Sequence, residues 1–226
     1  MRYRAGSFRG PGKGPGDGPG ARGRPRTGQG RERHGGVTGE TTVGVKSGEH
    51  WVFGYGSLMW RPGFAFLERV RARLQGRHRA FCIYSVHHRG VPSRPGLVLG
   101  LAPGGSVWGA AYRIADDAWP EVLAYLRERE QPTETYVERT VRLGLADGRR
   151  ITAISYLSDR NHPQWAGRLS FEAQARLIAG ARGLSGPNVE YLRDLAEHLR
   201  AEGLPDAHME RLLARVEEIE AREAAA

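Results

Sequence analysis

Residues 51–60, with the sequence WVFGYGSLMW, join a bulky apolar run to a turn that contains two glycines. The apolar run indicates a short strand that is buried on both faces. Glycine allows the backbone to adopt a positive φ or to approach a ligand closely, so the turn can direct several N–H groups into one concavity that suits a carboxylate or a developing oxyanion. A plain tight turn between two strands is the alternative. GYGS lacks the third glycine of GxGxxG and the Gly-Lys-Ser/Thr of a P-loop, so a phosphate site is not predicted.

One carboxylate, Glu130, is expected at the end of an apolar helical stripe. Asp116 or Asp117 can cap a helix that runs to residue 129. Its apolar residues recur at the spacing of one buried face and are Trp119, Val122, Leu123 and Leu126. Four residues further along, the stripe reaches Glu130, whereas Glu128 lies about 200° round the helix from Leu126 and faces water. A carboxylate in the position of Glu130 must be ion-paired, satisfied by donors or raised in pKa, and an ion pair with one of the many arginines is the alternative to a chemical role.

The charge of the chain is concentrated in its first segment. The 226 residues carry a formal net charge of +9 and are 39% hydrophobic, which is enough to form a substantial core. Residues 1–50 hold 10 of the 34 Lys and Arg and 4 of the 25 Asp and Glu, a balance of +6, and the rest of the chain therefore has a balance of only +3. The basic character belongs mostly to the N-terminal segment.

Residues 1–48 are dominated by Gly, Arg and Pro, and residues 49–226 form the expected folded domain. The first segment has almost no aliphatic side chains to offset the entropy of ordering, so it is predicted to be a disordered tail. An Arg/Gly-rich tail can also bind nucleic acid through phosphates and stacking. Few aromatic residues are interleaved with the arginines, so a solvated extension is favoured over a nucleic-acid-binding segment.

The single cysteine, Cys82, excludes an internal disulfide and favours a cytoplasmic enzyme. Because it lies in the apolar run AFCIY, we expect it to be a small buried side chain rather than a nucleophile. His87 and His88 are adjacent and point to different sides of an extended chain, so a metal site is not expected. No run of 18 apolar residues and no apolar leader is found, which predicts neither a membrane span nor a secretory signal.

The periodicity of the domain predicts both strands and helices. Strands are expected over residues 70–75 and 81–84, interrupted at Gly76, and over 97–101 and 107–112, joined by a Pro-Gly-Gly turn. Residues 136–145 and 151–157 are expected to form a hairpin around Asp147 and Gly148. Three helices are expected over residues 171–183, 189–202 and from 207 onward, with Ser170, Asn188 and Asp206 as their caps.

Five short pieces of the sequence, in this order, resemble the ChaC family of glutathione-specific γ-glutamylcyclotransferases. They are residues 52–60 (VFGYGSLMW), 88–96 (HRGVPSRPG), 107–112 (VWGAAY), 125–130 (YLRERE) and 186–192 (GPNVEYL). Each piece alone is weak, but five in order over residues 51–199 are highly specific. Residues 131–135, QPTET, depart from the glycine-containing link expected there, which affects the local loop and selectivity on the leaving-group side.

The resemblance implies an α+β fold in which a mixed β-sheet or small barrel is covered by helices. It also implies cleavage of glutathione to 5-oxoproline and cysteinylglycine without a cofactor or a metal. In this reading Glu130 is the general acid/base, and the turn holds the substrate α-carboxylate and stabilises the oxyanion. The residues implied to bind substrate are Val52, Phe53, Gly54, Tyr55, Gly56, Ser57 and Leu58.

Tyr191 is a further candidate, at the border of a helical face. Leu192, Leu195 and Leu199 recur on the buried side of the helix, and Tyr191 lies one step away. A tyrosine there can bury its ring and still present its hydroxyl to a pocket, where it would contact the γ-glutamyl group or Glu130. Plain packing is the alternative.

Two other functions remain open at the level of the sequence. One is a cyclotransferase for another γ-glutamyl amine or amino acid, because the contacts that select the leaving group cannot be identified from these motifs. The other is a nucleic-acid-binding module that uses the Arg/Gly-rich tail.

Overall fold

The computed structural model describes residues 49–130 and 135–226, so the predicted disorder of residues 1–48 and most of the segment 131–135 lie outside the described residues. The chain begins with β1 (His50–Gly54), a 3-10 turn η1 (Ser57–Met59), β2 (Glu68–Ser85), β3 (Gly96–Ile114) and α1 (Trp119–Glu130). It continues with β4 (Tyr136–Leu145), β5 (Arg150–Ser158), α2 (Phe171–Ile178), β6 (Arg182–Gly183), β7 (Gly186–Pro187), α3 (Asn188–Ala201) and α4 (Ala207–Ala224).

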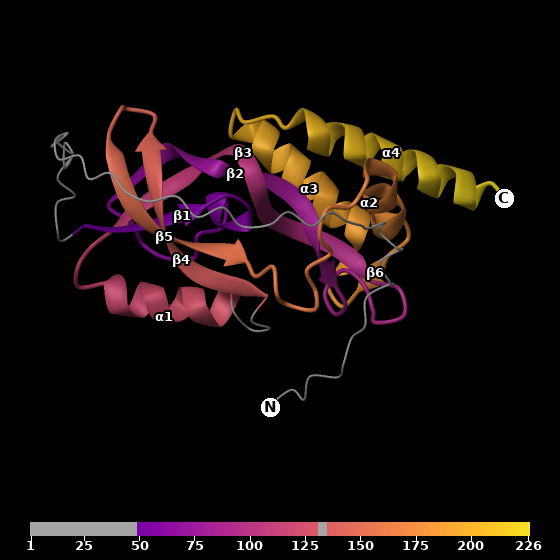
Figure 1. Ribbon diagram of the computed structural model, residues 1–226, viewed down its shortest axis with the longest axis horizontal. Coiled ribbons are helices and arrows are strands. Elements are labelled where there is room, and N and C mark those ends of the chain that lie inside the picture. The colour runs from indigo at the N-terminus through magenta and orange to yellow at the C-terminus, as the bar shows by residue number, and fades with distance from the viewer. Residues whose placement is uncertain (1–48, 131–134) are drawn as a thin grey trace, which may run out of the picture.

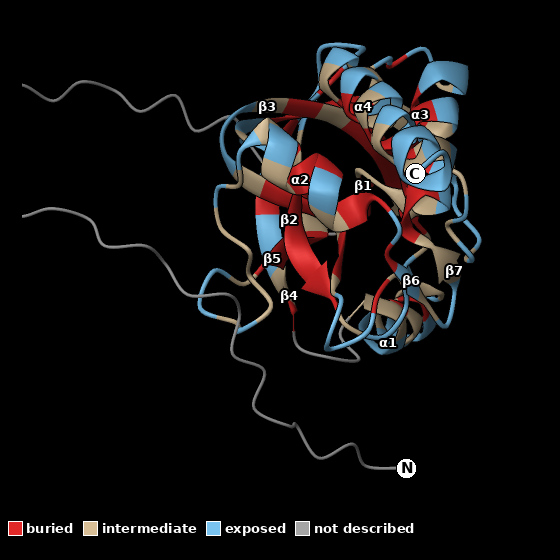
Figure 2. Cartoon of the chain, turned by 90° about the vertical axis from the view of Figure 1, so that its right-hand side faces the viewer, coloured by how far each residue is buried: buried red, intermediate tan, exposed pale blue. Residues whose placement is uncertain are grey.

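Five strands close into a barrel in the order β1-β3-β2-β4-β5 (Figure 1). β1 pairs with β3 in antiparallel and with β5 in parallel orientation, and the other pairs are antiparallel, so the sheet is mixed as predicted. The expected buried strand is confirmed, because Trp51, Val52 and Phe53 of β1 are at most 2% exposed. Figure 2 shows the buried residues concentrated on the strands and on the inner faces of the helices. The barrel therefore holds the glycine turn at the end of a rigid strand.

β2 and β3 are each one long strand where the sequence predicted two shorter ones. Gly76 does interrupt β2, with φ of 77°, and the register with β3 shifts between Gln75 and Arg77. Opposite this point, Gly104 and Gly105 have φ of 95° and 67°, but the strand continues through them instead of turning back. The glycines therefore form an irregularity within the paired β2–β3 ribbon and do not end it. The two strands remain hydrogen-bonded to each other on both sides of the glycines.

Three helices, α2, α3 and α4, pack together over the far part of β2 and β3, and α1 lies apart from them against the barrel (Figure 1). Two of the predicted caps are confirmed: Ser170 accepts a hydrogen bond from Ala173 N, and Asp206 accepts from the amides that begin α4. α1 starts at Trp119, one or two residues later than a cap at Asp117 or Asp116 predicts. Pro120, which has no N–H, fits the first turn of a helix. The acidic pair before it forms a turn and not a cap.

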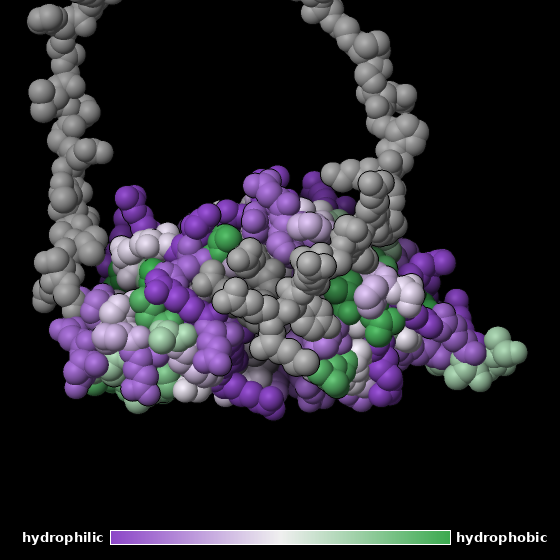
Figure 3. All heavy atoms as spheres, turned by 90° about the horizontal axis from the view of Figure 1, so that it is seen from below, coloured by the Kyte–Doolittle hydropathy of each residue, from purple (hydrophilic) through white to green (hydrophobic). Residues whose placement is uncertain are grey.

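The β4–β5 hairpin and the buried cysteine also match the sequence. Gly148 has a φ of 91° in the tight turn between the strands. Cys82 is 1% exposed, and its burial raises the pKa of the thiol to about 12, so it remains protonated and unreactive. In the described part of the chain, none of the helices combines the length and the apolar character needed to span a membrane. On the face in Figure 3 hydrophilic residues predominate, and hydrophobic ones form small separate groups.

Candidate active site

The glycine turn follows β1 directly and leads into η1. Met59 N donates to Gly56 O at 2.8 Å, and Arg61 N donates to Ser57 O at 2.8 Å. Gly54 is required by close approach, because a Cβ at this position would lie 2.7 Å from the Cβ of Leu58. The first N–H groups of such a turn have no partner within it. They are therefore available to an anionic group at this edge of the barrel.

Several of the predicted binding residues can offer only their backbone. Val52 and Phe53 are fully buried and Leu58 is 7% exposed. The carbonyl of Phe53 accepts from Ser155 Oγ at 3.1 Å, and that of Leu58 accepts from the Tyr112 hydroxyl at 2.9 Å. Their side chains belong to the core, and their role near the turn is to fix its position.

Glu130 is the last residue of α1, and its side chain is 19% exposed. Glu128 faces water, so the structure confirms which of the two carboxylates turns inward. Burial raises the pKa of the Glu130 carboxyl, and the charge of Arg129 opposes this shift only in part. A carboxyl group of raised pKa can both accept a proton and return it, as a general acid/base must.

Arg129 joins Glu130 to the glycine turn. Its Nε lies 3.2 Å from Glu130 Oε1, and its Nη2 donates to Ser57 Oγ at 3.0 Å. Its Nη1 donates to the Tyr125 hydroxyl at 2.8 Å. The ion pair considered for Glu130 is therefore present, but its partner is the adjacent residue, and the same guanidinium positions the turn. The sequence did not single out Arg129, because its neighbour in the helix supplied the stronger signal.

Three partly buried tyrosines lie within the electrostatic reach of Glu130. Tyr55 donates to the carbonyl of Tyr156 at 2.8 Å, Tyr136 donates to Leu99 O at 2.6 Å, and Tyr191 accepts from Leu99 N at 3.4 Å. Burial is the main cause that raises the pKa of each hydroxyl, and the negative charge of Glu130 adds to it. All three hydroxyls are therefore neutral hydrogen-bonding groups at neutral pH. Tyr136 was not predicted, since nothing in its strand pattern distinguishes it.

Arg89, from the HRGVP piece, reaches the same region. Its guanidinium carbon lies 5.5 Å from the centroid of the Tyr191 ring, and its Nη1 donates to Pro187 O at 3.0 Å. Its backbone N–H donates to Ser85 Oγ at 3.0 Å, which fixes the start of the loop. The structure thus brings the second and fifth matching pieces of the sequence together beside Tyr191. Arg89 was quoted in the motif but not assigned to the site.

The helix that carries Tyr191 is held differently from the prediction. Asn188 is fully buried and does not cap α3 through its side chain. Its Oδ1 instead accepts from Leu97 N at 2.6 Å, and its Nδ2 donates to Leu97 O at 2.8 Å. Pro187 occupies the cap position. A buried amide is stabilised more by two strand hydrogen bonds than by one at an exposed helix end.

The described residues contain no group of three or more His, Cys, Asp or Glu side chains arranged to hold a metal ion. What they do bring together is one half-buried carboxylate, two guanidinium groups and neutral tyrosine hydroxyls beside a glycine turn. This set can bind an anion and transfer a proton.

Comparison with known proteins identifies the family of the chain. The profile of a family described as ChaC-like protein matches residues 50–219. Glutathione-specific gamma-glutamylcyclotransferase of Escherichia coli strain K12 is 38% identical over 172 residues, which cover 76% of this chain and 74% of that protein. The human glutathione-specific gamma-glutamylcyclotransferase 1 is 35% identical over 173 residues, with 75% and 78% covered.

The fold is also similar to a solved structure. The crystal structure of a yeast gamma-glutamyl cyclotransferase specific to glutathione aligns with a TM-score of 0.66 at 25% identity, and the alignment covers 76% of this chain and 99% of that one. The family match spans most of the barrel and its helices, including the turn, Glu130 and Tyr191. The chain therefore belongs to the ChaC-like protein family.

Proposed function

We propose that this protein is a γ-glutamylcyclotransferase that cleaves glutathione to 5-oxoproline and cysteinylglycine, with Glu130 as its general acid/base. The observation that carries the proposal is a carboxylate of raised pKa, 19% exposed, that the Arg129 guanidinium joins to the glycine turn. The names of the E. coli and human relatives support glutathione as the substrate.

The reaction needs one proton carrier and a folded substrate. The α-amine of the γ-glutamyl group attacks its own γ-carbonyl, a C–N bond forms to close the five-membered ring, and the amide C–N bond to cysteine breaks. Glu130 takes a proton from the attacking amine and gives one to the departing nitrogen, so the balance is complete without water or another reactant. Attack within one molecule gains several kcal/mol when the ends are held in position.

The groups around Glu130 suit the two charges of the substrate. In this proposal the N–H groups of the turn at Tyr55, Gly56 and Ser57 bind the α-carboxylate and the oxyanion that forms at the γ-carbonyl. Arg129, beside the turn, and Arg89, beside Tyr191, add positive charge, and the neutral Tyr191 hydroxyl offers a hydrogen bond. In this proposal the side chains of Val52, Phe53 and Leu58 support the turn from the core.

The substrate assignment is tested by release of 5-oxoproline from a panel of γ-glutamyl compounds. Glutathione, γ-glutamylalanine and γ-glutamyl-lysine share the γ-glutamyl arm and differ in the leaving group. We expect turnover of glutathione with a kcat/KM well above that of the other two. Turnover of another γ-glutamyl compound with glutathione inert would retain the cyclisation chemistry and reject glutathione. We place the reaction in the cytoplasm, which suits a protein whose single cysteine is a buried free thiol.

A further inference from the structure

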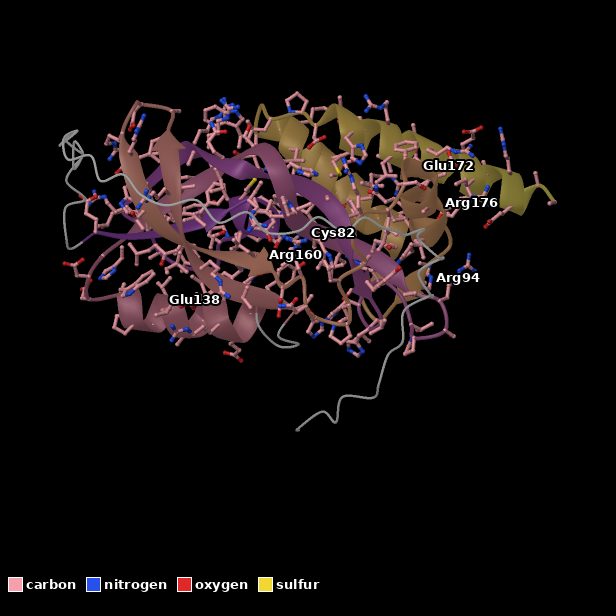
Figure 4. The ribbon with its side chains drawn as sticks, viewed as in Figure 1. Cys82, Arg94, Glu138, Arg160, Glu172 and Arg176 are labelled. Atoms are coloured by element: carbon pink, nitrogen blue, oxygen red, sulfur yellow. The ribbon has the colours of Figure 1, made fainter. Side chains whose placement is uncertain are left out.

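A cavity of about 890 Å³ opens between the β2–β3 ribbon and the helices α2 and α4. Among the described residues, neither Glu130 nor any residue of the glycine turn lines it. Its walls combine aromatic and polar side chains, and those that bear on a ligand are Arg79, Trp108, Trp165, Arg168, Gln174 and Asp206. Cys82 and Arg160, which also line it, are labelled in Figure 4. The cavity is therefore a space separate from the proposed catalytic carboxylate.

Arg79 is a buried cation on the strand wall of this cavity. It is 8% exposed, and the carboxylate that acts favourably on its charge is Asp206 of the same lining, at a distance longer than an ion pair. Its hydrogen-bond partners are neutral. Nε donates to Tyr55 O at 2.7 Å, and Nη2 donates to Trp108 O at 2.5 Å and to Met59 Sδ at 3.4 Å. Burial lowers the pKa of Arg79 to about 10, so the group remains charged at neutral pH. Asp206 offsets the cost of burying this charge only in part, because burial still lowers the pKa of Arg79, so a further anion would stabilise it.

Gln174 presents an unused acceptor on the opposite wall. The side chain is 8% exposed, and its Nε2 donates to Leu169 O at 3.2 Å. Its Oε1 is buried and has no hydrogen-bond partner in the described part of the protein. Buried polar atoms of this kind are nearly always paired in folded proteins. The cavity thus lacks an anion in direct contact with Arg79 and a donor for Gln174.

The charges near the opening have the same sign as Arg79. Arg160 and Arg168 are exposed and form no ion pair with any residue that the structure describes. Asp206 is the carboxylate of the lining, and it already accepts hydrogen bonds from His208 N and Met209 N as the cap of α4. The lining therefore carries three guanidinium groups and one carboxylate, and this excess of positive charge favours an anion.

We propose that this cavity binds a small molecule that carries a carboxylate and an N–H donor, the chemical class of amino acids and short peptides. The carboxylate would pair with Arg79 and the arginines at the opening, and the donor would satisfy Gln174 Oε1. Trp108 and Trp165 provide apolar surface for the part of the ligand between these groups. Arg79 also donates a hydrogen bond to the carbonyl of Tyr55, so it would link an occupant of the cavity to the glycine turn.

The tryptophans provide a direct test. Trp108 and Trp165 line the cavity, and the other three of the five tryptophans do not: Trp51, Trp60 and Trp119. The full chain labelled with ¹⁵N-tryptophan would be titrated with glycylglycine while the indole N–H signals are recorded by NMR, and Trp165→Phe would assign one of them. We expect the signals of Trp108 and Trp165 to shift in a saturable manner. We expect acetate, which has no N–H donor, and glycinamide, which has no carboxylate, to bind at least about tenfold more weakly.

Variants identify the groups involved. Gln174→Met removes the acceptor, and Arg168→Gln removes an exposed charge whose loss leaves the core intact; each should weaken glycylglycine binding about fivefold or more. Arg176→Gln is the matched control, since Arg176 is exposed on α2 and does not line the cavity. Glu130→Gln should bind glycylglycine as the wild type does, which separates this site from cyclotransferase activity. Unmoved Trp108 and Trp165 signals, shifts that survive both cavity variants, or acetate binding as tightly as glycylglycine would each overturn the proposal.

Discussion

Arg129 Nη2 donates to Ser57 Oγ at 3.0 Å, and this hydrogen bond ties the last turn of α1 to the turn that follows β1. The two residues are 72 positions apart in the chain. Because Glu130 is adjacent to Arg129 and in contact with it at 3.2 Å, the same bond determines how far the carboxylate lies from the glycine turn. The geometry of the site thus depends on a polar contact between a helix end and a loop.

Replacement of Glu130 by Gln tests the proton carrier. The variant keeps the shape of the side chain and removes the group that accepts the proton, so kcat/KM for 5-oxoproline release should fall by about 100-fold or more. Glu128→Gln is the control on the same helix, because Glu128 is exposed. Retained turnover in Glu130→Gln, together with loss of activity in Glu128→Gln, would contradict the assignment.

The same substitution has a pH-dependent effect on stability. The folded protein binds a proton at Glu130 more tightly than the unfolded chain, because burial raises the pKa of this carboxyl. At pH values between the ordinary glutamate pKa and the raised pKa of the folded protein, unfolding releases a proton. The stability of the wild type therefore falls relative to that of Glu130→Gln as pH increases. Above the pKa of the folded protein, the difference in stability no longer changes with pH. Urea unfolding of both proteins across this range measures it. A difference that does not change with pH would show that the carboxyl is not perturbed.

Arg129→Lys tests the set of contacts that the Arg129 guanidinium makes with Ser57, Tyr125 and Glu130. A lysine keeps the charge but cannot contact Ser57, Tyr125 and Glu130 together, so kcat/KM should fall roughly tenfold, as expected for loss of a charged hydrogen bond. Arg127→Lys is the control, since Arg127 pairs with Glu138 outside the site. Ser57→Ala and the variant with both substitutions complete a double-mutant cycle. If the effects of the two single substitutions on the free energy derived from kcat/KM simply add, the two residues act independently.

Tyr191→Phe separates binding from packing. The ring, which meets Phe81 and Arg89, survives the change, and the hydroxyl is lost together with a long bond from Leu99 N at 3.4 Å. If the hydroxyl contacts substrate, kcat/KM should fall by the factor that corresponds to a loss of about 1 kcal/mol of transition-state stabilisation. The Tm should not change. Unaltered kinetics would assign Tyr191 to the core.

A chain that begins at Gly48 tests the role of the basic N-terminal segment. The family match starts at residue 50, and the barrel begins at His50, so we expect the shortened protein to fold and to release 5-oxoproline as fast as the full chain. Any affinity for RNA should disappear with the segment and, in the full chain, fall steeply with added salt. Salt-resistant, sequence-selective RNA binding by the shortened protein would instead indicate a nucleic-acid surface on the barrel.

Local signals in the sequence predicted the elements that depend on neighbouring residues. The buried strand before the turn, the hairpin at Asp147 and Gly148, and the caps at Ser170 and Asp206 each follow from a few adjacent residues. The inward direction of Glu130 followed from helical periodicity alone. These features are determined within one element, so the rest of the fold was not needed to find them.

Features that depend on distant pairing were not predictable in the same way. Glycine-rich segments at Gly76 and Gly104 read as strand ends, but each strand continues because the other supplies its hydrogen bonds. The helix start at Asn188 looked like a capping signal, and only the position of β3 shows that its amide has a better partner. Arg129 likewise gains its contacts from a loop far away in the sequence.

The Asn188 side chain forms hydrogen bonds with both the N–H and the C=O of Leu97, as a residue of an adjacent strand would. The side-chain amide of Asn188, the first residue of α3, therefore takes the place of a peptide group of a neighbouring strand on the free side of β3. A shift of the helix by even one residue would leave four buried hydrogen-bonding groups without partners, so α3 cannot slide along the barrel, and Tyr191 keeps its distance from the turn. Exchange of the single amide hydrogen of Leu97 with solvent therefore reports the free energy needed to detach the helical layer from the sheet.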